Sequence, residues 1–303
     1  MLEQLEFIIA CAGKSTRNYP HAKGLPHKCL LPMGDVRLID WVLQDIISAG
    51  GRHVTFVCGD QKTIDALREA LSNDAATEEK LRAKGHVRVA NALRSTFLPA
   101  DMDIKYAIQE KPIGTAQVLG LAHRLSPARH GVLIFPDDII ISPDKENSHL
   151  KRMCADFLKN ENQIVLTGVE KEDVSNNAII HNNRLIEKPK IAYNKIGGYS
   201  PIIMCRACMD FIERETARIE QTGQMPAYLS AGEWIYADGI NSFLDSAPEN
   251  TCTLKMFLKD TADELWDTGT LPLYEQAQIR ALLTHSSGAE ENRRIAREVL
   301  SEN

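Results

Sequence analysis

Short apolar runs alternate with helical patterns along the first half of this chain, and this alternation constrains its fold more than any other feature. Apolar runs of strand length are typical of buried strands, and the amphipathic stretches between them are typical of crossover helices. The pattern therefore predicts an α/β fold with a doubly wound, mostly parallel sheet. The predicted strands are 7–10, 53–58, 104–108, 132–135 and 164–169, and the predicted helices between them are 38–49 and 114–125.

Composition limits the kinds of protein that this chain can be. Its net charge of −6 argues against a general nucleic-acid binder, which would carry a basic surface. The first apolar run is too short for a signal peptide, and no apolar stretch is long enough to span a bilayer. The 7 cysteines are mostly isolated along the sequence, as is typical of reduced thiols, and the CxxC spacing of Cys205 and Cys208 is interpreted as coincidence. We therefore expect a cytoplasmic protein without a membrane or nucleic-acid partner.

Two helical regions fall outside the predicted sheet. Residues 61–101 are charged and helical, so we expect a solvated helical insertion. The tail has helical patterns at 272–284 and 290–300, and their Leu, Ile and Ala spacing suits packing against the main domain or against a second subunit of a homo-oligomer. We predict a main domain over 1–271 and a C-terminal helical extension over 272–303.

A loop of small residues with two cations follows the first predicted strand. In loop 11–17 the small side chains let backbone N–H groups approach phosphate oxygens, while Arg17 and Lys28 supply positive charge. The loop follows a strand, and α/β sheets bind ligands beyond the carboxyl ends of their strands. It matches neither the P-loop nor the Gly-x-Gly-x-x-Gly dinucleotide motif. A nucleoside triphosphate site and an ordinary turn with exposed cations both remain open from the loop alone.

Acidic residues follow two other predicted strands. Asp137 and Asp138 end the apolar run that begins at residue 132, and Asp267 lies after the strand-like run 251–258. Carboxylate oxygens are the ligands that Mg²⁺ prefers, and a cation explains carboxylates placed beside a polyphosphate. A polar turn that caps the next element is the alternative for the first pair.

Seven motifs occur in order over most of the chain. They are 12–17, 28–32, 109–116, 136–138, 186–190, 232–238 and 266–270. Together they resemble the motifs of sugar-1-phosphate nucleotidyltransferases, in particular the bacterial UTP:glucose-1-phosphate uridylyltransferases. The resemblance implies a Rossmann-like nucleotidyltransferase fold, UTP and glucose 1-phosphate as substrates, and Mg²⁺ as cofactor.

The resemblance also implies a reaction and a set of site residues. A sugar phosphate oxygen would attack the α-phosphorus of the nucleotide and expel pyrophosphate, so the protein must position groups and neutralise charge. The implied catalytic residues are Arg17, Lys28 and Lys188; nucleotide binding is assigned to Ala12, Gly13, Gln109 and Gly114, sugar binding to Ala178, Glu187 and Glu233, and metal binding to Asp137 and Asp267.

Two of these residues carry the expected choice of base. The amide of Gln109 has both a donor and an acceptor and suits a pyrimidine edge, and Gly114 lets the base lie against the backbone. These features favour UTP or dTTP over purine nucleotides.

Three departures from the motifs leave details open. Ser15 stands where the family has its second glycine, and the stretch 22–28 is one residue longer than usual, which makes Lys23 a second candidate for part of the role of Lys28. Asn177 and Ala178 stand where the uridylyltransferases have Tyr-Gly, so the identity of the sugar stays open. A catalytically silent relative that binds nucleotide sugars is the alternative function, although the retained charged residues favour catalysis.

Overall fold

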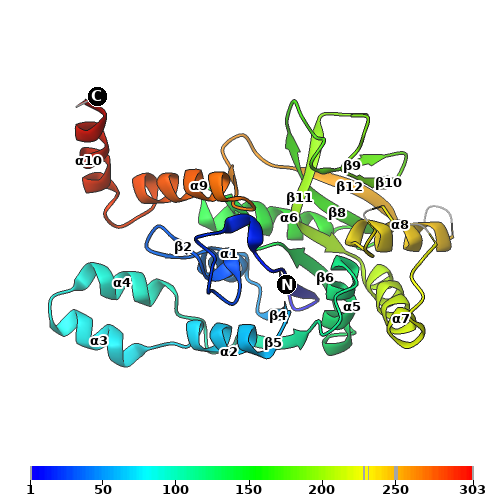
Figure 1. Cartoon of the computed structure of the whole chain (residues 1–303), viewed down its shortest axis with the longest axis horizontal. Coiled ribbons are helices and arrows are strands. Elements are labelled where there is room, and N and C mark those ends of the chain that lie inside the picture. Colours follow the sequence, from blue (N-terminus) through cyan, green and yellow to red (C-terminus); the bar gives the residue numbers. More distant parts are fainter. Residues whose placement is uncertain (1, 228, 231, 249–251, 302–303) are drawn as a thin grey trace.

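The computed structural model describes residues 2–227, 229–230, 232–248 and 252–301, and its centre is one mixed sheet with helices on both faces (Figure 1). The strands of this sheet are β1 (Leu5–Cys11), β4 (His53–Cys58), β5 (Asp103–Ile108), β6 (His130–Ile134), β8 (Gln163–Glu170), β9 (Ala178–His181), β10 (Arg184–Glu187), β11 (Ile196–Met204) and β12 (Thr253–Leu258). Two small two-stranded sheets accompany it: β2 (Pro32–Met33) with β3 (Val36–Arg37), and β7 (Asp138–Ile141) with β13 (Glu264–Asp267).

The helices include the predicted crossover helices, the predicted insertion and the predicted C-terminal helices. They are α1 (Leu38–Ala49), α2 (Gln61–Ala70), α3 (Ala75–Ala83), α4 (Val87–Ser95), α5 (Thr115–Leu125), α6 (His149–Phe157), α7 (Arg206–Thr222), α8 (Tyr236–Ser246), α9 (Leu271–Thr284) and α10 (Ala289–Ser301), with the short 3-10 helices η1 (Thr16–Asn18), η2 (Lys28–Leu30) and η3 (Lys145–Asn147). None of the described helices combines the length and the apolar composition needed to cross a membrane.

The sheet has a parallel half and an antiparallel half. Its strand order is β10-β9-β11-β6-β1-β4-β5, and β8 pairs with β11 and β12. The strands β6, β1, β4 and β5 are all parallel, as βαβ connections require. Around β11 the pairing with β6, β8 and β9 is antiparallel. The predicted α/β fold with a Rossmann-like sheet is confirmed, and the antiparallel strands are its addition.

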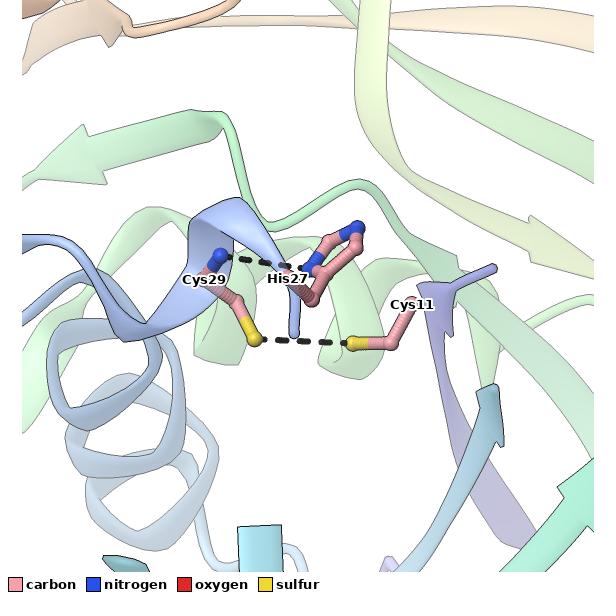
Figure 2. A group of neighbouring side chains, drawn as sticks. All are labelled: Cys11, His27 and Cys29. Carbon is pink, nitrogen blue, oxygen red and sulfur yellow. Dashed lines mark hydrogen bonds between the residues drawn. The ribbon is translucent and has the colours of Figure 1, made fainter. Parts of the chain in front are cut away.

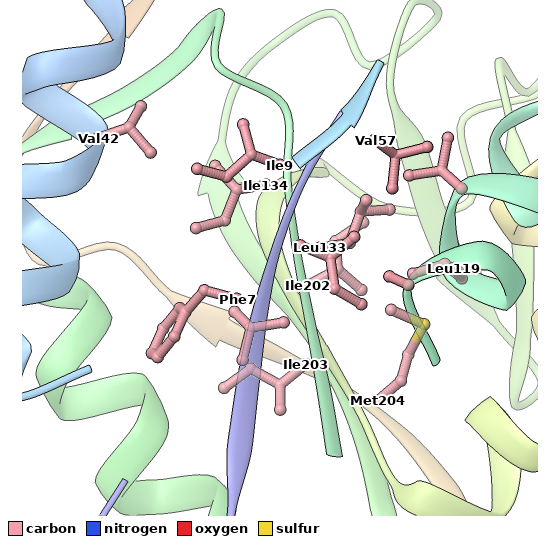
Figure 3. Close-up of a cluster of buried hydrophobic side chains, with 14 of the residues drawn as sticks. Phe7, Ile9, Val42, Val57, Leu119, Leu133, Ile134, Ile202, Ile203 and Met204 are labelled. Atoms are coloured by element: carbon pink, nitrogen blue, oxygen red, sulfur yellow. The ribbon is translucent and has the colours of Figure 1, made fainter. Parts of the chain in front are cut away.

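Period-two alternation in the strands fills both faces of the sheet (Figure 3). Phe7 and Ile9 project from β1 toward the face that carries Val42 of α1, while Leu133 of β6 projects toward Leu119 of α5 on the other face. All of these side chains are buried. The core therefore fixes the strand ends from which the loops of the site depart.

The insertion and the tail differ in how they contact the sheet domain. The insertion forms α2, α3 and α4, as predicted, and α3 has no buried residue. In the tail, α9 packs on the domain, where the Tyr274 hydroxyl donates to the Pro32 carbonyl at 2.5 Å. The last helix, α10, has no buried residue and extends beyond α9 (Figure 1). Packing on the main domain is thus confirmed for α9, whereas α10 contacts α9, and its packing against a second subunit stays a prediction.

Candidate active site

A cavity of about 520 Å³ opens at the carboxyl ends of the parallel strands. The loops after β1, β5 and β6 form one wall, and residues of β9, β10 and β11 contribute to the other. This is the edge at which α/β sheets bind ligands. The lining includes Ala12, Gly13, Arg17, Lys28, Gln109, Gly114, Asp137, Ala178, Glu187, Lys188, Glu233 and Asp267. Every site residue expected from the sequence thus faces one space, whereas Lys23 is not among the residues that line it.

The loop after β1 is held by Ser15. This residue adopts a left-handed conformation with φ of 56°, which a serine rarely occupies and a glycine adopts freely. Its hydroxyl oxygen accepts the backbone N–H of Lys28 at 2.9 Å. Ser15 therefore adopts a backbone conformation that suits glycine better, and its hydroxyl ties the loop to the segment that carries Lys28.

A small antiparallel sheet brings the two acidic motifs together. In the pairing of β7 with β13, Asp267 lies opposite Asp138, and the N–H of Thr268 donates to the carbonyl of Asp137 at 2.7 Å. The carboxylates of Asp137 and Asp267 each lie 3.0 Å from the point that a Cβ on Gly269 would occupy. Glycine at 269 thus leaves open the space on which both carboxylates converge.

Charge in this corner is partly balanced within the protein. The ammonium group of Lys28 forms an ion pair with the Asp137 carboxylate, and both side chains are largely buried. Asp138 accepts the N–H of Ser200 at 3.0 Å. Burial raises the pKa of Asp138, and the neighbouring Asp137 charge raises it further. Asp137 and Asp267 are therefore the carboxylates that suit a hard cation such as Mg²⁺.

The amide of Gln109 is oriented by the protein itself. Its nitrogen donates to the Gly114 carbonyl at 3.0 Å and to Oε1 of Gln117 at 2.8 Å. Both amide hydrogens are used in these bonds, so the expectation that Gln109 offers a donor as well as an acceptor to a base is wrong. The carbonyl oxygen of this side chain remains for a ligand.

Gly114 is required by a close approach within the protein. Its φ is 134°, and a Cβ at this position would lie 2.2 Å from the carbonyl oxygen of Trp234. The two segments are joined in register, because the Trp234 N–H donates to Ile113 at 2.8 Å and its carbonyl accepts from Ala116 at 3.0 Å. The space beside the α-carbon of Gly114, where we expected a nucleotide base to lie, is thus occupied by the Trp234 backbone.

The opposite wall presents an acid and a cation at the end of β10. Glu187 accepts the hydroxyl of Tyr236 at 3.1 Å, and burial raises the pKa of this carboxyl. Lys188 has a left-handed backbone with φ of 46°, and its N–H donates to the carbonyl of Asn177 at 3.1 Å. Its side chain is exposed and makes no ion pair within the described part of the chain. This cation is therefore available to an anionic ligand.

The site geometry agrees with the comparison to protein families. Residues 7–279 match the family described as nucleotidyl transferase. The chain belongs to this family.

Individual relatives of this nucleotidyl transferase share less than a third of its residues in the aligned part. It is 29% identical over 201 residues to the UTP–glucose-1-phosphate uridylyltransferase of Haemophilus ducreyi, an alignment that covers 62% of this chain and 65% of that protein. The chain thus spans just under two thirds of that relative's length.

Solved structures share the fold of this transferase over almost the whole chain. A UDP-glucose pyrophosphorylase from Acinetobacter baumannii matches with a TM-score of 0.77 and 16% identity, over 97% of this chain and 99% of that one. A UTP-bound UGPase from the same organism matches with a TM-score of 0.75 and 16% identity, over 97% and 98%.

Three residues that position the site of this transferase were not predicted from the sequence. Gln117 orients Gln109, Trp234 packs against Gly114, and Tyr236 holds Glu187. Trp234 and Tyr236 lie inside the motif 232–238, where only the acidic residue was singled out. Trp234 and Tyr236 leave little signal in a single sequence because their partners come from distant segments, whereas Gln117 lies only eight residues from Gln109.

Proposed function

We propose that this transferase moves a uridylyl group from UTP to a sugar 1-phosphate and releases pyrophosphate, with glucose 1-phosphate as the expected acceptor. The observation that carries the proposal is one cavity lined by three cations, several carboxylates and the amide of Gln109. The names of a curated relative and of a UTP-bound structure with the same fold support UTP as the donor.

The three cations suit a reaction between two phosphate-bearing substrates. Arg17 would hold the pyrophosphate that leaves, Lys28 would contact phosphates of both substrates, and Lys188 would neutralise the sugar phosphate. Two anions repel each other as they approach, and negative charge builds on the leaving group, so fixed cations lower the barrier by positioning and electrostatics. Lys28 comes from the parallel side and Lys188 from the antiparallel side, which supports a reaction at the junction between them.

Magnesium is the cofactor that the acidic residues suit. Asp137 and Asp267 offer hard oxygen ligands that converge on the space left open by Gly269. When bound, Mg²⁺ would neutralise phosphate charge and polarise the phosphorus for attack.

The orientation of Gln109 gives a specific rule for the base. Its free carbonyl oxygen can accept the N3–H of uracil or thymine, whereas N3 of cytosine is itself an acceptor. We therefore propose that the site selects a base that donates from N3. This rule is narrower than a general preference for pyrimidines.

The sugar would bind against the Glu187 wall. The carboxylate of Glu187 can accept hydrogen bonds from sugar hydroxyls while Tyr236 holds it in place. Ala178 is buried at the start of β9 and faces the same cavity, so its methyl group reduces the space for the sugar.

Pyrophosphate release tests the proposed reaction. Purified protein is incubated with Mg²⁺, UTP and each of several sugar 1-phosphates, and both pyrophosphate and nucleotide sugar are measured. We expect the two products in equal amounts with at least one sugar. If the protein binds UDP-sugar tightly but forms no pyrophosphate with any sugar and nucleotide, it is a silent binding relative and the proposal is wrong.

A further inference from the structure

Three side chains that can bind a transition metal ion lie close together where loop 11–17 begins (Figure 2). Cys11 ends β1, and His27 and Cys29 come from the segment that carries Lys28. All three are buried, with exposed fractions of 1%, 2% and 0%. One ligand atom from each lies within 4.8 Å of the other two, which makes this the one such group of potential metal ligands in the described residues. None of these three side chains has a role in the proposed transfer.

The spacing of the two sulfur atoms fits a tetrahedral metal ion. The Sγ atoms of Cys11 and Cys29 are 3.8 Å apart. For Zn–S bonds of about 2.3 Å, the edge of a tetrahedron between two sulfur ligands is also about 3.8 Å. A disulfide needs a sulfur–sulfur distance of about 2 Å, so the pair must move to form one. The cluster can thus accept a zinc ion with little change in sulfur position.

We infer that Cys11, His27 and Cys29 form a site for a single Zn²⁺ ion. Two thiolates and one imidazole are the ligands that zinc prefers, and they disfavour Mg²⁺, which prefers oxygen. Two thiolate charges balance the charge of Zn²⁺, so the cluster is neutral and its burial costs less than that of an isolated charge. The zinc site is therefore chemically separate from the carboxylates of Asp137 and Asp267.

Binding requires one local exchange at His27. Its Nδ1 accepts the N–H of Cys29 at 3.2 Å, a long hydrogen bond, and this lone pair would turn to the metal. His27 also lines the cavity, and a water molecule would have to supply the fourth ligand from that side. The stretch 22–28, which is one residue longer than in the uridylyltransferases that the sequence resembles, supplies this histidine.

The position of the cluster gives the ion a mechanical role. Cys11 precedes the loop with Ser15, and Cys29 follows Lys28, whose N–H donates to the Ser15 hydroxyl at 2.9 Å. A metal bound to both cysteines would give a second link, besides this hydrogen bond, between the segment that carries Arg17 and the segment that carries Lys28. Zinc would then act as a structural link beneath the nucleotide site.

A second cysteine pair provides a matched control. Cys205 and Cys252 are buried with their sulfur atoms 3.9 Å apart. They form no group of three potential ligands in the described residues. Comparing the two pairs therefore distinguishes the effect of two neighbouring sulfur atoms from the effect of a group with three potential metal ligands.

The test measures metal binding directly on the full-length chain. Protein freed of metal by a chelator is titrated with Co²⁺, which reports tetrahedral thiolate ligation by a charge-transfer band and intense visible bands, and Zn²⁺ is then added in competition. We expect one Co²⁺ per chain, displaced by one Zn²⁺. Cys29→Ser and Cys11→Ser should lose the charge-transfer intensity, His27→Asn should alter the visible bands, and Cys205→Ser should behave like the wild type.

Thermal unfolding and intact mass complete the test. Zn²⁺ should raise the unfolding temperature of the wild type and of Cys205→Ser but not of Cys29→Ser, provided that circular dichroism shows all three to be folded. The inference is overturned if the wild type shows no thiolate–cobalt band. It is also overturned if Cys205→Ser loses the band as Cys11→Ser does, or if the wild-type mass shows a Cys11–Cys29 disulfide in place of metal.

Discussion

The parallel and antiparallel halves of the sheet build opposite walls of the cavity in different ways. On the parallel side, two functional side chains are held by other residues: Lys28 pairs with Asp137, and Gln109 is fixed by Gln117, although Arg17 is exposed. On the antiparallel side, Lys188 is exposed at the end of a short hairpin and forms no ion pair with any described residue. The parallel side, the proposed nucleotide wall, thus has two side chains in place without ligand, whereas the antiparallel side, the proposed sugar-phosphate wall, leaves its cation for the ligand to position.

This difference indicates where specificity is set. A side chain that is already hydrogen-bonded can reject a mismatched ligand, because a buried polar group would be left unpaired. A mobile cation attracts any phosphate and discriminates little. We therefore expect strict selection of the base and broader acceptance of sugar phosphates.

The largest expected loss of activity comes from a substitution in the acidic pair Asp137 and Asp267. Asp137→Asn removes a proposed metal ligand and the partner of Lys28, so turnover should fall by about a thousandfold, the upper range for loss of one electrostatic group. Pyrophosphate release measures the change, and EDTA should stop the wild type. Asp65→Asn, on the exposed surface of α2, is the control that should keep full activity. A turnover near the wild-type value for Asp137→Asn would remove this residue from the site.

The base rule gives the next largest effect. Because Gln109 offers only its carbonyl oxygen, UTP should be used more efficiently than CTP by about a hundredfold or more. Gln109→Leu should shrink this ratio by removing the acceptor. The ratio of kcat/KM values is compared within each protein, so a general loss of activity does not confuse the result. Equal use of the two nucleotides by the wild type would contradict the proposed orientation.

Removing the exposed cation of the sugar-phosphate wall, Lys188, should lower activity less, and by a similar factor for every sugar 1-phosphate. Lys188→Ala should lower kcat/KM roughly tenfold to a hundredfold for every sugar 1-phosphate, since all of them share the phosphate. Lys190→Ala is the matched control, because Lys190 is exposed two residues away and does not line the cavity. An equal effect of the two substitutions would show that general surface charge, and not a specific contact, attracts the substrate.

The smallest effect concerns the stability of the nucleotide wall. Gly114→Ala places a methyl group 2.2 Å from the Trp234 carbonyl oxygen, so it should lower the free energy of unfolding by about 1–3 kcal/mol. Gly24 also has a positive φ, of 89°, but a Cβ there meets nothing within 4 Å. Gly24→Ala therefore measures the cost of the backbone conformation alone. Denaturant unfolding of both variants should show the larger loss for Gly114→Ala, and equal losses would contradict the close packing against Trp234.

Apart from β8 and β12, which match the runs 164–169 and 251–258, the antiparallel side is less well predicted from the sequence than the parallel side. The predicted strand 53–58 and helix 38–49 agree with the observed β4 and α1, because local apolar patterns determine buried parallel strands and their crossover helices. β11 was not predicted, since its sequence contains Gly197, Gly198 and Pro201, and its pairing depends on distant strands.

A turn between β9 and β10 could have been predicted. Asn182 and Asn183 both have positive φ, of 49° and 52°, and two such residues between short apolar runs are typical of a tight hairpin. The contacts that orient the site were beyond reach, because Gln109 and Trp234 meet their partners only after the chain has folded. Four of the 7 cysteines, although distant along the sequence, likewise lie in two close pairs.

The pairing of the two acidic motifs has a consequence for the growing chain on the ribosome. The hydrogen bond between Asp137 and Thr268 joins residues 131 positions apart. The four parallel strands are complete at residue 134 and can associate while synthesis continues, but Asp267 is added much later. An incomplete chain that stops before β13 can therefore form much of the sheet and still lack half of the acidic pair. The late strand thus delays assembly of the proposed metal site until β13 has been made.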